Sequence, residues 1–193
     1  MTRKSTAWVV TALAIATTPA FGPTVAVAAP QQAPIADNAV IQGPARKDLA
    51  RQILDDKGIA LLNSHVGGQN DPNSTARRNI KDTSKGKAAR TSPWSDVGVK
   101  KVKLDQNMLK GMVALGKKYN FRVTAIAGGD HEPASFHYSG TAFDIDRIDG
   151  RPVSAGNSKV AKVKTTCADL GAVEILGPGD EGHDSHVHCA WKS

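Results

Sequence analysis

The chain has 193 residues, with 25 lysines and arginines, 18 aspartates and glutamates, and two cysteines. This length is typical of one domain with a sizeable core, and the formal net charge of +7 predicts a salt-sensitive attraction to anionic polymers. Nucleic acid is not the expected partner, because the basic residues carry no recognition motif and the chain opens on an export signal.

The first residues have the pattern of a signal peptide. A charged tip and a short apolar stretch lead to Ala26-Val27-Ala28, which is typical of a cleavable export signal. The apolar stretch is too short for a membrane span, which needs about 20 residues. We expect residues 1–28 to be a signal peptide, residues 29–45 a flexible tether, and residues 46–193 a monomeric domain that is secreted to the cell wall.

The two cysteines, Cys167 and Cys189, both lie in the last third of the chain. An even pair in an exported protein predicts one disulfide. A metal site is the alternative. Against it, Cys189 follows His188 directly, so on an extended strand its side chain would point away from the face that His186 and His188 share.

Hydrophobic periodicity predicts helices and short strands in alternation. The expected helices span residues 46–57, 105–119 and 158–170, and the expected strands span 59–62, 121–127, 141–146, 172–176 and 185–191. Gly58 is expected to end the first helix in the left-handed conformation, and Asp105 to cap the second. This mixture favours an α+β fold with a small, mostly antiparallel sheet and helices packed on one face.

Residues 67–90 have a different composition, with six lysines and arginines against two aspartates, and with Gly, Asn and Ser between them. This predicts a long, basic, polar loop. Two interpretations stay open: an irregular solvated surface, or a cationic face that meets an anionic substrate or polymer.

Four of the six histidines fall within two short polar stretches that also carry aspartate. His137, with Asp144 seven residues on, and the distant pair His186 and His188 offer the nitrogen and oxygen donors that Zn²⁺ binds, with room for water as a further ligand. His186 and His188 project from one face of the last expected strand, and Asp144 faces away from its apolar neighbours. The pattern predicts a zinc site made by His137, Asp144 and His188.

The role of His186 stays open between two alternatives. It could bind the metal, or it could stay off the metal and act on water or on an oxyanion formed from substrate; we favour the second. His183 and Asp184 are candidate acid, base or orienting groups, with a plain surface loop as the alternative, and Glu181 is a weaker candidate for the base.

The acidic segment that begins at Asp144 could also suggest a calcium-binding loop. The EF-hand pattern needs a glutamate at the twelfth position of the loop, where this chain has Ala155. The spacing therefore disfavours calcium.

The motifs Ser135-x-His137-x-x-Gly140-x-Ala142-x-Asp144 and His186-x-His188 resemble those of a superfamily that contains D-Ala-D-Ala carboxypeptidases, murein endopeptidases and hedgehog signalling domains. The similarity extends loosely from the expected helix near Asp105 onward. It implies a hedgehog/D-Ala-D-Ala-peptidase-like fold, in which the residues matching His137, Asp144 and His188 bind zinc and the one matching His186 is an active-site histidine beside it.

Two positions depart from this pattern. Many carboxypeptidases of the group carry Tyr-Arg after the strand that here ends at Ala127, and the arginine holds substrate charge; this chain has Gly128-Gly129. The usual Glu or Asp base three residues before the last ligand is replaced by Ser185. His186 is therefore expected to do that work.

Together these features predict a secreted zinc metallopeptidase that hydrolyses peptide bonds of peptidoglycan, of the D,D-carboxypeptidase or murein endopeptidase type. Its expected partners are peptidoglycan or its stem peptides, and anionic wall polymers. The alternative is a non-catalytic zinc-containing binding protein of hedgehog-like fold, which recognises a cell-wall polymer or a protein partner.

Overall fold

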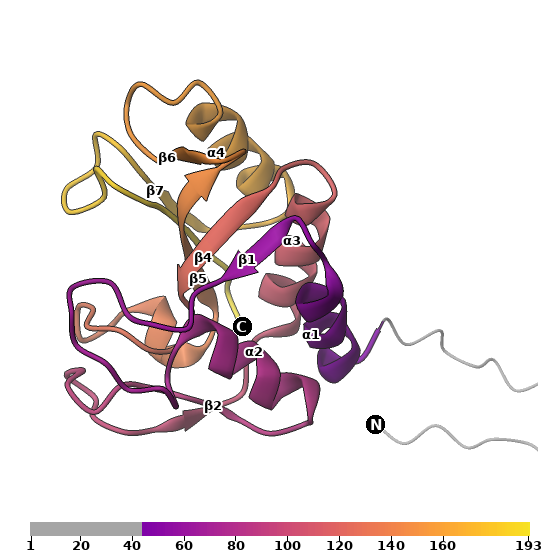
Figure 1. Cartoon of the computed structure of the whole chain (residues 1–193), viewed down its shortest axis with the longest axis vertical. Helices are drawn as coiled ribbons and strands as arrows, with labels where there is room; N and C mark the ends of the chain where they lie inside the picture. Colours follow the sequence, from indigo (N-terminus) through magenta and orange to yellow (C-terminus); the bar gives the residue numbers. More distant parts are fainter. Residues whose placement is uncertain (1–43) are drawn as a thin grey trace, which may run out of the picture. The chain divides into compact units, whose positions relative to one another are not determined.

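The computed structural model describes residues 44–193 (Figure 1). The signal peptide expected over residues 1–28, and all but the last two residues of the expected tether, lie outside this range. Within the described part, four α-helices combine with a mixed sheet, which is compatible with the predicted α+β class. No helix of that part is long and apolar enough to cross a membrane.

The elements follow one another in mixed order along the chain. The helices are α1 (Arg46–Asp55), α2 (Ala76–Ser84), α3 (Gln106–Gly116) and α4 (Val160–Asp169), with a short 3₁₀ turn η1 (Phe136–Ser139). The strands are β1 (Ile59–Leu61), β2 (Ala89–Arg90), β3 (Lys101–Val102), β4 (Phe121–Ala125), β5 (Ala142–Ile148), β6 (Arg151–Pro152), β7 (Glu174–Leu176) and β8 (Val187–Ala190).

The main sheet of the described residues has six strands in the order β1-β4-β5-β8-β7, with β6 paired to β5. β1 and β4 run parallel, and the other pairs of that sheet are antiparallel. The sheet over residues 44–193 is thus mostly antiparallel, as predicted, and β1 lies at one of its edges. β2 and β3 form a separate antiparallel pair.

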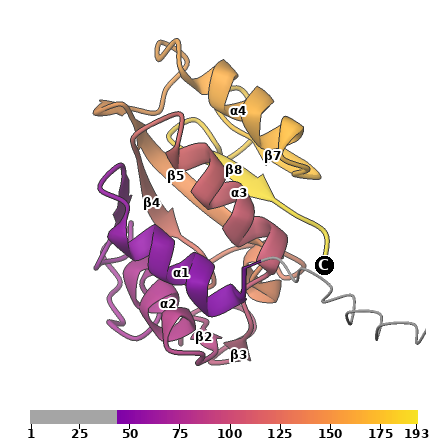
Figure 2. The same ribbon diagram turned by 90° about the vertical axis from the view of Figure 1, so that its right-hand side faces the viewer.

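Three helices cover one face of the main sheet. Figure 2 shows α3 across the strands, with α1 and α4 on either side, and both of these helices contact α3. Phe143 of β5 is fully buried beneath them, between Phe121 and Trp191, whose ring centroids lie 6.3 Å and 5.5 Å away. Because side chains alternate along a strand, Asp144 projects to the opposite face.

The predicted helices are present: α1 begins at the predicted residue, and the other helix ends differ from prediction by one to three residues. Asp105 caps α3 as expected, since its carboxylate accepts a hydrogen bond from Met108 N at 2.9 Å. The prediction for Gly58 is wrong, because its φ angle is not positive. α1 ends instead at Asp55, and the carboxylate of Asp56 accepts a hydrogen bond from Gly58 N at 2.8 Å.

The prediction of a long loop over residues 67–90 is also wrong, because α2 and β2 lie within it. Thr75 caps α2 by accepting a hydrogen bond from Arg78 N at 3.2 Å. Ile80 is the one large apolar residue on the buried face of α2, and Asn79 and Thr83 make up much of the rest. A buried face this polar gives almost no hydrophobic periodicity.

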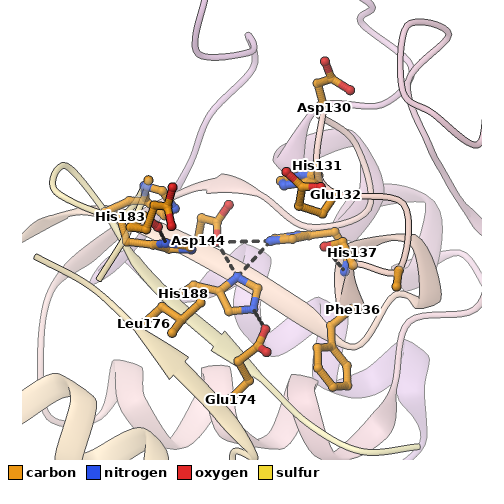
Figure 3. A pocket seen from close by; sticks show the side chains of 15 residues that line it. Asp130, His131, Glu132, Phe136, His137, Asp144, Glu174, Leu176, His183 and His188 are labelled. Atoms are coloured by element: carbon orange, nitrogen blue, oxygen red, sulfur yellow. Dashed lines mark hydrogen bonds and ion pairs between the residues drawn. The ribbon is translucent and has the colours of Figure 1, made fainter. Parts of the chain in front are cut away.

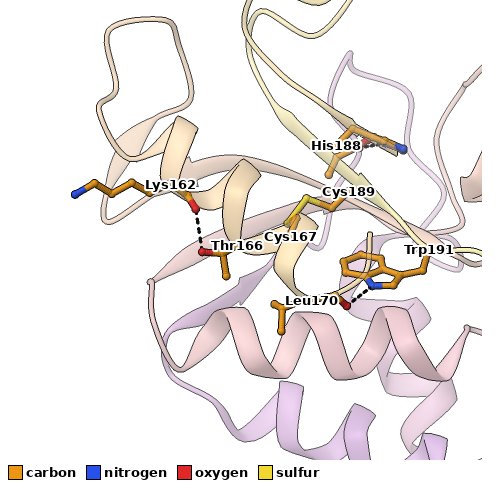
Figure 4. The surroundings of a disulfide bond; sticks show 8 residues. Lys162, Thr166, Cys167, Leu170, His188, Cys189 and Trp191 are labelled. Atoms are coloured by element: carbon orange, nitrogen blue, oxygen red, sulfur yellow. Dashed lines mark hydrogen bonds and ion pairs between the residues drawn. A yellow bond between two sulfur atoms is a disulfide. The ribbon is translucent and has the colours of Figure 1, made fainter. Parts of the chain in front are cut away.

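The predicted disulfide between Cys167 of α4 and Cys189 of β8 is present (Figure 4). Both cysteines are fully buried. Cys189 is flanked on β8 by His188, so the two side chains lie on opposite faces of the strand. The bond therefore ties the strand that carries His188 to the helical layer.

Replacing both cysteines with alanine is expected to lower the free energy of unfolding by about 2–4 kcal/mol, because the bond closes a loop whose ends are 22 residues apart. Urea unfolding measures this. Wild-type protein treated with a reductant is the control and should unfold at a similar urea concentration; an unchanged midpoint in both samples would contradict a stabilising role.

Candidate metal centre

Two neighbouring strands and one turn bring the predicted ligands together. β5 and β8 pair with Asp144 directly opposite His188, and His137 reaches the same point from η1. His137 Nε2 lies 3.1 Å from both Asp144 Oδ1 and His188 Nδ1. His188 Nδ1 lies 2.9 Å from Asp144 Oδ1 (Figure 3). All three side chains are buried, and we call them the ligand trio.

The local sequence orients the His137 ring. Ser135 Oγ accepts a hydrogen bond from His137 N at 3.3 Å, and Gly140 ends η1 with a φ of 71°, a conformation that favours glycine. His137 Nδ1 lies 2.6 Å from the carbonyl oxygen of Ile126. Because a carbonyl oxygen only accepts, Nδ1 carries the proton, and a neutral His137 presents a bare Nε2 to the other two ligands.

The spacing of the donor atoms fits a metal ion. Zinc holds histidine nitrogens and carboxylate oxygens at about 2.0–2.2 Å in a tetrahedral arrangement, which puts neighbouring ligand atoms about 3.3 Å apart. The separations in the ligand trio, 2.9–3.1 Å, are close to this. Three lone pairs aimed at one another repel unless a cation or a proton lies between them. A His-His-Asp group that could hold a metal ion is therefore present.

The charges within the ligand trio depend on one another. Burial alone would raise the pKa of Asp144, but His137 and His188 outweigh it and hold that pKa well below its ordinary value. Burial would lower the pKa of His137, and the Asp144 carboxylate more than offsets this, so that pKa is raised. Asp144 therefore stays ionised, and a metal ion at His137 competes with a proton.

His131 is a further histidine at the centre and is not among the predicted site residues. It offers a ligand atom within 4.8 Å of those of His137 and Asp144, so it is an alternative third ligand. However, the His131 ring stacks on His137, with centroids 3.8 Å and planes 9° apart. The lone pairs of imidazole lie in the ring plane, so two parallel stacked rings cannot aim at one ion. The His188 ring is inclined by 61° to His137, and the geometry favours it.

The loop that carries His131 is fixed by Tyr138. The Tyr138 hydroxyl accepts a hydrogen bond from His131 N at 2.9 Å and donates one to His131 O at 2.8 Å. Burial, followed by the charge of His137, lowers the pKa of His131 to about 3. His131 is therefore neutral at ordinary pH and forms one wall of the centre.

The ligand trio opens into a cavity of about 830 Å³. Its walls come from the loop after β4 and from the segment before β8 (Figure 3), and they carry carboxylates, histidines and a few apolar side chains. A second cavity of about 480 Å³ adjoins it and shares Asp130, His131, Asp144, Gly182 and His186 with the first. The two cavities make one cleft that runs past Asp144.

Of the three predicted catalytic residues, His186 is best placed. It lines both cavities, and burial lowers its pKa, with His183 and His188 adding to the effect against the opposing charge of Asp144. A neutral His186 beside the ligand trio can accept a proton.

His183 lines the first cavity, with its ring centroid 4.6 Å from that of His186 and 5.9 Å from that of His188. Its Nδ1 donates to the carbonyl oxygen of Glu181 at 2.6 Å. Asp184 lines neither cavity; it is exposed and accepts a hydrogen bond from Gly179 N at 3.3 Å. The structure therefore does not bring Asp184 to the ligand trio, because its carboxylate is held at the main chain of Gly179.

Close packing surrounds Gly128-Gly129, the pair at which the sequence departs from the Tyr-Arg that the resemblance implies. A Cβ atom on Gly128 would lie 2.0 Å from the carbonyl oxygen of Ser74. Gly129 has a φ of 118°, and a Cβ there would lie 2.7 Å from His131 Nε2. The loop before α2 and the His131 ring thus occupy the space that larger side chains would need.

Gly128→Ala is expected to lower the free energy of unfolding by about 1–3 kcal/mol, because main-chain atoms must shift to admit the methyl group. Urea unfolding measures this. Gly156→Ala is the matched control, since its Cβ would meet nothing closer than Ser154 Oγ at 3.9 Å. Equal stability of the two variants would contradict the close approach at Gly128.

No family model matches the chain. No curated protein and no solved structure was found to match it either. The resemblance to zinc peptidases therefore depends on the short motifs around His137 and His188 alone.

Proposed function

We propose that the chain is a secreted zinc metallopeptidase that hydrolyses peptide bonds of peptidoglycan. The convergence of His137 Nε2, Asp144 Oδ1 and His188 Nδ1 within 2.9–3.1 Å is the observation that carries the proposal. Two nitrogens and one carboxylate oxygen are a donor set typical of catalytic zinc, with one coordination position left for water or substrate. The hedgehog/D-Ala-D-Ala-peptidase-like fold implied by the motifs is part of the same proposal.

Bound zinc supplies Lewis-acid activation of water and of the scissile carbonyl group. The protein's own residues do the rest. His186 takes the proton of the attacking water and returns it to the leaving amine, since its lowered pKa keeps it neutral beforehand. His131 and His183 line the cavity into which the reaction centre opens.

The shape of the cleft favours an endopeptidase over a strict carboxypeptidase. Cavities on both sides of Asp144 leave room for substrate residues on both sides of the scissile bond. Among the residues that line the two cavities, Arg147 is the single lysine or arginine. It is the candidate for holding a substrate carboxylate in place of the arginine missing at Gly128-Gly129.

Digestion of purified peptidoglycan, followed by mass spectrometry of the released muropeptides, tests this function. An endopeptidase is expected to convert cross-linked dimers to monomers, whereas a carboxypeptidase would shorten stem peptides by one residue. Protein that holds zinc and releases no new amine would overturn the peptidase proposal in favour of the non-catalytic zinc-containing binding protein.

The distribution of charge supports anionic wall polymers as a further partner. Residues 44–105 carry thirteen lysines and arginines against seven acids, whereas residues 106–193 carry ten of each. The exposed Arg77 and Lys81 of α2 and the exposed Lys85 at its C-cap follow one another at intervals of four residues, which places them in a single row. This row, the α2 cation row, faces away from the buried side of the helix.

Replacing the α2 cation row with glutamine is expected to weaken binding to walls rich in anionic polymer and to flatten its dependence on salt. Co-sedimentation with purified walls over a series of NaCl concentrations measures both effects. The matched control replaces the exposed Lys110, Lys117 and Lys118 with glutamine, which removes the same charge elsewhere. Equal losses in the two triple variants would show that net charge, and not this row, governs binding.

A further inference from the structure

Glu174 lies behind the ligand trio, on the side of His188 away from the other two ligands. Its Oε1 is 3.3 Å from His188 Nε2 (Figure 3), whereas His188 faces Asp144 through Nδ1. The two nitrogens lie on opposite sides of the imidazole ring. Glu174, which also lines the first cavity, therefore contacts His188 at the nitrogen that does not face Asp144.

Strand register explains why Glu174 reaches His188. β7 and β8 are antiparallel, with Leu176 opposite His188 and Glu174 opposite Ala190. Side chains two residues apart on β7 share a face, so Glu174 is the diagonal neighbour of His188, a distance that a long side chain can span. β7 lies at the edge of the main sheet opposite to β1 in the described residues.

His188 Nε2 has no other partner in the part of the chain that the structure describes. The atom is buried, and no group of residues 44–193 makes an aligned hydrogen bond to it. The His188 side chain is 6% exposed and that of Glu174 is 43% exposed. A buried N–H without an acceptor is costly, so the Glu174 carboxylate is the one acceptor at hand, and it keeps access to solvent.

We propose that Glu174 is a positioning residue that holds His188 with its proton on Nε2, so that Nδ1 stays bare and aimed at the metal. Histidine ligands commonly donate their second ring N–H to a carboxylate, which fixes the tautomer and the ring orientation. The expected effect of Glu174 on metal affinity rests on the proposed zinc site. The expected tautomer of His188 does not.

Loss of such a partner typically weakens metal binding by about 10- to 100-fold. Glu174→Ala is expected to fall in this range for Zn²⁺, measured by competition with a chelator, and to change the visible absorption spectrum of the Co²⁺-substituted protein. Glu174→Gln keeps an acceptor oxygen and should recover most of the affinity. Glu181→Ala is the matched control, because Glu181 lines the same cavity and contacts His183 through its main chain alone.

Long-range ¹H–¹⁵N spectra of the metal-free full chain, at a pH where histidine is neutral, test the tautomer directly. Wild-type protein and Glu181→Ala should show His188 protonated at Nε2, and Glu174→Ala should show a mixture or the other tautomer. His188 protonated at Nδ1 in the wild type, or Glu174→Ala with unchanged tautomer and zinc affinity, would overturn the proposal. Wild-type protein that binds no zinc but shows the expected tautomers would refute the proposed function and leave the role of Glu174 standing.

Discussion

Asp144→Ala is expected to remove bound zinc and peptidoglycan hydrolysis together. Asp144 supplies the one negative charge of the ligand trio, and its side chain meets both His137 and His188. Its loss should weaken zinc binding by more than the roughly 10- to 100-fold that loss of an outer partner costs. Metal analysis after dialysis, beside the release of new amines from purified peptidoglycan, measures the two effects.

Asp146→Ala is the matched control, since it lies two residues further along the same strand. Asp146 forms an ion pair with Arg122 and does not touch the ligand trio. This variant should keep stoichiometric zinc, even if it is less stable. Full zinc content in Asp144→Ala would rule out the proposed ligand set.

His186→Ala is expected to keep zinc and to lose about 100- to 10,000-fold in hydrolysis, the range typical of a lost general acid or base. His186 lies beside the ligand trio and lines both cavities of the cleft, yet it is not needed to complete the donor set. Metal content and the rate of amine release, compared on the same preparation, separate these two effects.

His183→Ala shows which of the two neighbouring histidines does the work. The Nδ1 of His183 is already bonded to the Glu181 carbonyl oxygen, so a smaller loss is expected than for His186→Ala. A His186→Ala protein with full activity would refute the proposed role. A larger loss in His183→Ala would transfer that role to His183.

The elements that could be predicted are those whose buried faces are apolar. α3 packs through Met108, Leu109, Met112 and Leu115, and the fully buried Phe143 and Ile145 give β5 its alternation. α2 escaped prediction because small polar residues fill most of its buried face, although Thr75 at its N-cap was a usable signal. β2, β3 and β6 have two residues each, too few to show a period.

In the candidate site, residues placed by local sequence could be predicted, and residues placed by tertiary structure could not. His137, Asp144 and His188 could be selected because their spacing within local motifs reflects the η1 turn and the alternation of β5 and β8. His131 and Glu174 could not, since a loop fixed by Tyr138 and the register of β7 against β8 bring them to the centre. Such placement depends on tertiary structure, for which a short motif carries no signal. Asp184 is the converse case: it is close to His186 and His188 in sequence, but its carboxylate binds the main chain of Gly179.

Strand β8 connects the candidate metal centre to the helical layer of the domain. The disulfide anchors β8 to α4 on the helical side, and on the other side of the same strand His188 faces Asp144 and Glu174. The same short strand therefore positions a proposed metal ligand and contributes to the stability of the domain. Changes that loosen β8 should affect metal affinity before they unfold the domain.

The most direct test of the central claim is an anomalous difference map, measured at the zinc absorption edge, from crystals of the full chain grown with zinc. We predict one strong peak within about 2.0–2.2 Å of His137 Nε2, Asp144 Oδ1 and His188 Nδ1, with His131 and His186 outside bonding distance. A peak bound by His131 in place of His188, or no peak at the ligand trio, would contradict the account.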